Sequence, residues 1–168
     1  STKVGEYFSN QSHYDFSRDQ TIRSVKNSLT LLGLHELDIV YVHSDGDDQK
    51  VIQETDVLET LIELKTRGLI RAIGFSGKTV AGSRLALDVC DIFMISLNQQ
   101  DLSQSQLINE CNARGKCVVI KKALASGHSA DPGQAMRFAH QYPGVNSVIV
   151  GSINPSHLSQ NIAAIKAV

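Results

Sequence analysis

The sequence predicts an α/β fold built around a parallel sheet, and three observations support this prediction. Short apolar runs alternate with longer segments in which apolar residues recur every three or four positions, the spacing of one helix face. The apolar runs do not alternate with polar residues, so their strands are expected to be buried on both faces, as in a parallel sheet. Polar residues close two of the runs, at His43 and Ser76. Because α/β folds place their chemistry at the carboxyl ends of parallel strands, both residues are candidates for a functional site.

The N-terminal half starts with a strand end and a polar stretch and then alternates regularly. Its first helix has apolar residues on one face, and Gly33 is placed to end it. Gly68 ends the next helix in the same way. In this half we predict a strand end at Ser1–Val4, a polar loop over Glu6–Asp19, a helix at Arg18–Leu32, a strand at Leu37–His43, a polar loop and a helix within Asp45–Arg67, and a strand at Ile70–Phe75.

The C-terminal half repeats the pattern of strand and helix. Before the last helix, Asn154 is a candidate N-cap, and Pro155 takes the first helical position. Here we predict a short helix at about Val80–Val89, a strand at Ile92–Ile95, a helix at Leu102–Arg114, a strand at Cys117–Ile120, a turn at Ser126-Gly127, a helix at Pro132–Gln141, a strand at Ser147–Val150 and a helix at Pro155–Ala167.

Two folds have this order of elements, an open doubly wound sheet and a (β/α)8 TIM barrel. No Gly-x-Gly-x-x-Gly motif follows a strand, which weighs against a dinucleotide-binding open sheet. A barrel needs eight strands, and the pattern supplies about six βα units. For a barrel, we therefore expect about two βα units to be missing from the front of the chain.

The composition is that of an ordinary globular domain, so we expect residues 1–168 to form a single domain, part of such a barrel. Of the 168 residues, 42% are hydrophobic and 20% charged. The net charge of −1 gives no reason to expect nucleic acid or a membrane as partner. The first residues do not read as a signal peptide. Three cysteines, an odd number without metal-like spacing, are expected to be reduced, in a cytoplasmic protein without a metal site.

Five segments, in order along the chain, resemble motifs of the aldo-keto reductases. The clearest are LGLHELDIVYVH, which resembles the family's LGLDYIDLYLIH, and RGLIRAIGFS, which resembles GKIRAIGVSN. The resemblance implies a (β/α)8 barrel that passes a hydride from NADPH to a carbonyl, with this chain as the third strand through the eighth helix. The matching segments are Ser1–Gly5, Leu32–His43, Arg67–Ser76, Ala123–Gly127 and Ile149–Pro155, together with Asn161.

The resemblance implies two catalytic residues in the chain. Lys3 would lower the pKa of a tyrosine proton donor, as a cation does for a nearby phenol. His43 would polarise or orient the carbonyl of a small-molecule substrate. The tyrosine and its aspartate are expected before Ser1, because Tyr7 and Tyr14 follow the lysine. The 168 residues alone are therefore not expected to be a competent reductase.

The resemblance also implies a site for NADP(H) or possibly NAD(H). Ser76 would bind the nicotinamide carboxamide, and Lys121 takes the position of the aromatic residue that stacks on the nicotinamide. The remaining positions would hold the phosphates and the adenine, partly through the N-terminus of the last helix. They are Leu124, Ser126, Gly127, Gly151, Ser152, His157, Gln160 and Asn161.

Several positions depart from the family pattern. Gly77 replaces an asparagine, Met94 a glutamine, and Lys121 the stacking aromatic. The lysine and arginine that bind the 2′-phosphate fall at Gly151 and His157, so the choice between NADP and NAD stays open.

Two other functions remain open at this point. One is a non-catalytic reductase-like protein that binds a nucleotide or acts as a regulatory subunit. The other is an unrelated α/β barrel enzyme for phosphorylated substrates. The acidic run Asp45, Asp47 and Asp48 lacks the spacing of a calcium site and is expected to be a solvated loop.

Overall fold

The computed structural model describes residues 1–166, which divide into two compact units, Ser1–Phe93 and a second that begins at Met94. The six strands of the main sheet pair in the order β1-β4-β5-β6-β7-β8. Their bounds are β1 Thr2–Val4, β4 Leu37–His43, β5 Ile70–Ser76, β6 Ile92–Ser96, β7 Cys117–Lys121 and β8 Ser147–Val148. The pairings of β1 with β4, β4 with β5, β5 with β6 and β7 with β8 are parallel. The predicted α/β fold with a parallel sheet is therefore confirmed.

The register of the first unit sets two strand ends side by side. Residues His43 and Ser76 are direct partners at the carboxyl ends of β4 and β5. Lys3 on β1 is the partner of Tyr41, two residues before His43. Most residues of β4 and β5 are buried, as expected for continuous apolar runs in a parallel sheet.

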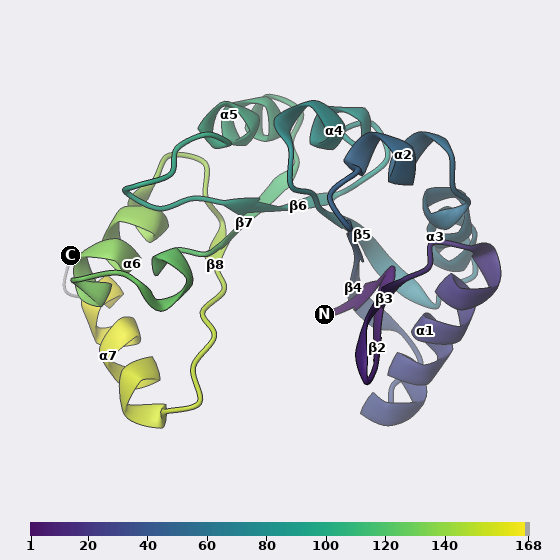
Figure 1. Ribbon diagram of the computed structural model, residues 1–168, viewed down its shortest axis with the longest axis horizontal. Helices are drawn as coiled ribbons and strands as arrows, with labels where there is room; N and C mark the ends of the chain where they lie inside the picture. Colours follow the sequence, from purple (N-terminus) through teal and green to yellow (C-terminus); the bar gives the residue numbers. More distant parts are fainter. Residues whose placement is uncertain (167–168) are drawn as a thin grey trace. The chain divides into compact units, whose positions relative to one another are not determined.

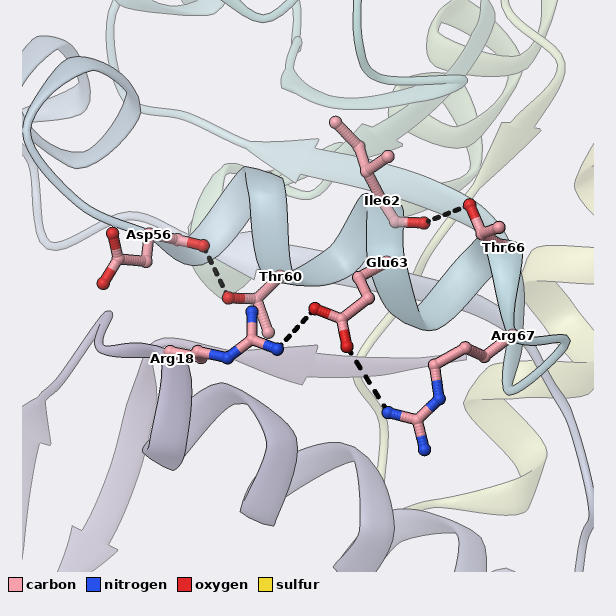
Figure 2. A network of polar contacts seen from close by, with 7 residues as sticks. All are labelled: Arg18, Asp56, Thr60, Ile62, Glu63, Thr66 and Arg67. Carbon is pink, nitrogen blue, oxygen red and sulfur yellow. Dashed lines mark hydrogen bonds and ion pairs between the residues drawn. The ribbon is translucent and has the colours of Figure 1, made fainter.

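Two long helices of the first unit pack together, as Figure 1 shows: α1 (Arg18–Leu32) and α3 (Val57–Thr66). The hydroxyl of Ser17 caps α1 by accepting a hydrogen bond from the Gln20 amide, and Gly33 ends it in the left-handed conformation at φ 63°. Glu63 on α3 forms ion pairs with Arg18 and Arg67 (Figure 2). All three side chains are substantially exposed, so these ion pairs contribute little to stability.

Up to residue 166, the second unit contains four helical segments: α5 (Ser105–Ala113), the 3₁₀ turn η1 (Ala125–Gly127), α6 (Pro132–Gln141) and α7 (Pro155–Lys166). Helices α6 and α7 pack against each other (Figure 1). The Asn154 carboxamide accepts a hydrogen bond from the Ser156 amide at 2.9 Å, which confirms the predicted N-cap. Ala167, the last residue of the predicted helix, lies outside the described residues. Among the helices of residues 1–166, none is long and apolar enough to span a bilayer.

The predicted polar loop over Glu6–Asp19 is wrong, because most of it forms a hairpin. Strands β2 (Glu6–Ser9) and β3 (Gln11–Tyr14) pair antiparallel around Asn10, which has φ 63°. The hairpin escaped prediction because most of its side chains are exposed, so no alternation of apolar and polar residues marks it.

Other boundaries also differ from the predictions. The segment before α3 contains a short additional helix, α2 (Asp48–Gln53). Helix α4 (Val80–Leu85) is shorter than predicted, α5 begins three residues late, and β8 ends at Val148. Helices of one or two turns lack the several periods of apolar spacing on which the prediction depends.

Candidate functional site

The predicted residues of the first unit lie at the carboxyl edge of its sheet. His43 is 26% exposed, and its Nε2 lies 3.3 Å from Oε2 of Glu6. Its partner Ser76 is buried, with 1% exposure. Lys3 is exposed on the neighbouring strand β1. The structure therefore brings His43 and Ser76 together.

The hairpin supplies an acidic residue that the sequence did not reveal. Glu6 contacts His43 and is the cross-strand partner of Tyr14. Burial, followed by the charge of Glu6 and a side-chain hydrogen bond with it, raises the pKa of Tyr14. Tyr14 therefore stays protonated beside Glu6 over the neutral range, and Glu6 links it to the histidine.

A buried carboxylate fixes the loop that follows Ser76. Asp48 is 1% exposed, and its Oδ2 accepts hydrogen bonds from the amide of Lys78 (2.9 Å) and from the amide and hydroxyl of Thr79 (2.7 Å each). The Lys78 ammonium donates in return to the Asp45 carbonyl at 2.7 Å. These hydrogen bonds connect the loops that follow β4 and β5. The prediction that Asp48 belongs to a solvated acidic loop is therefore wrong.

Close packing explains why glycine replaces the family's asparagine at position 77. A Cβ atom on Gly77 would lie 2.5 Å from Oγ of Ser83, 2.6 Å from Cε1 of Phe75 and 3.0 Å from Oδ2 of Asp48. No side chain fits there unless the neighbouring residues move.

The second unit has a cavity of about 330 Å³ beside the N-terminus of α7. Seven of its nine lining residues are predicted cofactor positions. The lining comprises Leu124, Gly127, Ser129, Pro132, Gly151, Ser152, His157, Gln160 and Asn161.

A buried amide distinguishes this cavity from an ordinary surface hollow. Asn161 is 6% exposed, and its side chain has no hydrogen-bond partner within residues 1–166. Because Asn161 lines the cavity, its carboxamide can offer a donor and an acceptor to a polar ligand there. Together with the helix N-terminus, this donor set fits a phosphorylated nucleotide.

A second cavity, of about 320 Å³, is lined by Lys122, Ala123, Leu124, Ser126, Gly127, Ile149, Val150 and Gly151. Three successive residues of its loop, from Ala125 to Gly127, have φ between 48° and 92°. Ser126 thus lines the second cavity, whereas Lys121 at the end of β7 lines neither of the two.

The chain has an α/β fold with a parallel sheet and a cavity of about 330 Å³ in its second unit, and comparison with known proteins identifies the family. The model of the aldo/keto reductase family matches residues 1–132, and the chain belongs to this family. A chain from Pseudomonas aeruginosa, described as an aldo-keto reductase, is 41% identical at a TM-score of 0.92, over 98% of this chain and 66% of that one. The aldo-keto reductase AKR11C1 from Bacillus halodurans is 19% identical at a TM-score of 0.85, over 99% and 66% of the two chains. That likeness shows the shared fold.

Two curated relatives are bacterial methylglyoxal reductases. Methylglyoxal reductase DkgB of Escherichia coli O157:H7 is 32% identical, and DkgB of Salmonella typhi is 27% identical. Each alignment covers 89% of this chain, and the chain spans 62% of the length of these relatives.

Sequence reasoning missed Glu6, Asp48 and Lys122 as residues of these sites. Glu6 lies in the unpredicted hairpin, and the bonds of Asp48 reach about thirty positions along the chain. For Lys122 a signal was present, because it directly follows a predicted strand and precedes the family's phosphate loop.

Proposed function

We propose that this chain takes part in the reduction of aldehyde and ketone carbonyls to alcohols by NADPH or NADH. The observation that supports this most is the cavity beside α7, where seven of nine lining residues occupy the family's cofactor positions. The fold is that of a family with members solved in complex with NADP, such as an aldo/keto reductase from Klebsiella pneumoniae.

Each predicted residue has a proposed role. Ser76 holds the nicotinamide carboxamide, the loop around Ser126 holds the diphosphate, and Gln160 and Asn161 hold the adenine. When bound, the reduced nicotinamide supplies a hydride to the carbonyl carbon. His43 would donate a hydrogen bond that polarises the carbonyl oxygen, and Lys3 would favour the transfer of a proton to that oxygen from the family's tyrosine.

The choice between the two cofactors depends on the positions that would face a 2′-phosphate. Gly151 has no side chain, and His157 stands where the family has an arginine. We propose NADPH as the main cofactor with measurable use of NADH. His157→Arg is expected to raise the ratio of kcat/KM for NADPH to that for NADH.

The activity test uses the full-length protein, NADPH and a series of aldehydes, ketones and quinones. Methylglyoxal belongs in the series because it is the substrate named for the DkgB relatives. We expect carbonyl-dependent loss of NADPH absorbance, and a loss of at least about 100-fold in kcat for Lys3→Met and His43→Ala. Lys26→Met, an exposed change on α1, is the matched control. An inactive wild-type protein across the whole series would contradict the proposal.

A non-catalytic nucleotide-binding protein is the second candidate. It is favoured by the replacements at Met94 and Lys121, whereas the replacement at Gly77 is explained by close packing. This candidate predicts that the wild-type protein binds NADPH without turnover, and that Lys3→Met and His43→Ala leave this binding unchanged.

A further inference from the structure

The two cavities of the second unit adjoin, and they differ in charge. Leu124, Gly127 and Gly151 line both of them. Lys122 contributes to the second cavity and is the only lysine or arginine among the lining residues described, none of which is acidic. The second cavity therefore favours an anion.

The backbone of Lys122 adopts a conformation that lysine does not prefer. Its φ is 59°, in the left-handed region. The left-handed conformation is unfavourable for any residue with a Cβ atom, whereas glycine adopts it without this cost in free energy. Backbone strain of this kind clusters at ligand sites, where the surrounding structure holds it in place. A lysine that stands where glycine would be easier points to a use for its side chain.

The surrounding structure holds this backbone from two sides. The Lys122 carbonyl accepts a hydrogen bond from the Ala125 amide at 2.9 Å and another from Nδ2 of Asn98 at 3.2 Å. Asn98 is only 7% exposed, and its Oδ1 accepts from the amides of Gln100 (2.9 Å) and Asp101 (3.0 Å). The loop geometry thus depends on the main chain of Lys122 and on Asn98, and does not require the lysine side chain.

The ammonium group remains available to a ligand. Within residues 1–166, Lys122 takes part in no ion pair. Asp101 is close enough to feel its charge: hydrogen bonds from Ser103 lower the pKa of Asp101, and Lys122 adds a smaller effect in the same direction. Asp101 accepts hydrogen bonds from the hydroxyl (2.6 Å) and amide (3.0 Å) of Ser103, so its carboxylate is already satisfied.

We propose that Lys122 binds the diphosphate of the nicotinamide dinucleotide, an inference that rests on the proposed function. A ligand that fills both cavities passes its middle across their shared wall of Leu124, Gly127 and Gly151. In a dinucleotide the middle is the diphosphate, which carries two negative charges. Lys122 lines the second cavity together with these three shared residues, so it lies in a cavity that borders the diphosphate, and a cation stabilises that group.

The test compares dissociation constants measured by isothermal titration calorimetry on the full-length protein. The ligands are NADPH, ADP and adenosine, of which only adenosine lacks phosphate. We expect Lys122→Met to weaken NADPH and ADP about tenfold, or about 1.4 kcal/mol, and to leave adenosine unchanged. Lys116→Met is the matched control, because it removes the same charge just before β7, at the opposite end of that strand.

Lys122→Gly separates binding from folding. Glycine relieves the left-handed backbone, so this variant should melt at or above the wild-type temperature and still bind NADPH about tenfold more weakly. Affinities of Lys122→Met for NADPH and ADP equal to those of Lys116→Met would overturn the inference while the proposed function stands. A wild-type protein that binds neither NADPH nor ADP would overturn both.

Discussion

Replacement of the buried Asp48 by asparagine should destabilise the first unit. Its carboxylate accepts bonds from the amides of Lys78 and Thr79 and from the Thr79 hydroxyl, at 2.7 to 3.1 Å. Asparagine keeps the shape but loses the charge and turns an NH₂ group toward the Lys78 amide. A bond to a charged acceptor is worth roughly 1 kcal/mol more than a neutral one, so we expect a loss of about 2 kcal/mol over these contacts.

The assay is urea unfolding followed by circular dichroism, with Asp47→Asn as the matched control. Asp47 is exposed and caps α2 by accepting from the Lys50 amide at 3.2 Å, a role that asparagine fills as well. The control should therefore stay within about 0.5 kcal/mol of the wild-type protein. Equal unfolding free energies for Asp48→Asn and Asp47→Asn would refute the assignment of Asp48 as the anchor. Because the anchored loop follows Ser76, we also expect a higher KM for NADPH.

Four further predictions follow from packing, exposure and charge. Gly77→Ala should cost about 1–3 kcal/mol through its close contacts, whereas Gly151→Ala, which meets nothing within 4 Å, should unfold like the wild-type protein. In the native protein the exposed Cys117 should react with a thiol reagent much faster than the buried Cys111, and equal rates would contradict the structure. Burial raises the pKa of the Cys111 thiol from 9.0 to about 11. The stability that the protonated thiol contributes is fully present below pH 9 and is lost as the pH rises through 11. Cys111→Ala should therefore reduce the fall in melting temperature over this pH range. Glu63→Gln breaks only exposed ion pairs, so its melting temperature should match the wild-type value, and a clear drop would show that α1 and α3 depend on them.

The sequence was most informative where local signals and burial agreed. Helix α1 could be predicted to the residue, because its apolar stripe ends at Gly33, which adopts the left-handed conformation. Strand β4 was equally clear, since its apolar run is buried in the sheet. The hairpin around Asn10 was missed because strands with exposed side chains leave no periodic signal in the sequence.

The candidate site divides in the same way between local and long-range information. Seven lining residues of the cavity beside α7 are positions that the family resemblance implies, and those that follow strands β7 and β8 meet at one edge of the parallel sheet. The role of Asp48 could not be read from the sequence, since a run of acidic residues looks the same whether it is solvated or anchors an amide thirty positions away. Lys121 shows that a position matched by resemblance need not line a cavity, because it lies beside the two cavities and lines neither.

The contacts of Gly77 give a structural reason for one departure from the family pattern, the glycine in place of asparagine. An asparagine there would collide with Ser83 and Phe75, so its absence follows from the packing around Asp48. The loop is held by a buried carboxylate from α2, and the missing asparagine therefore says nothing about whether the protein turns over a carbonyl. Gly77 therefore does not support a non-catalytic protein. The reductase and the nucleotide-binding protein are best distinguished by the effect of replacing His43. A reductase must lose turnover when His43 is replaced, whereas a nucleotide sensor keeps its NADPH affinity and has no turnover to lose.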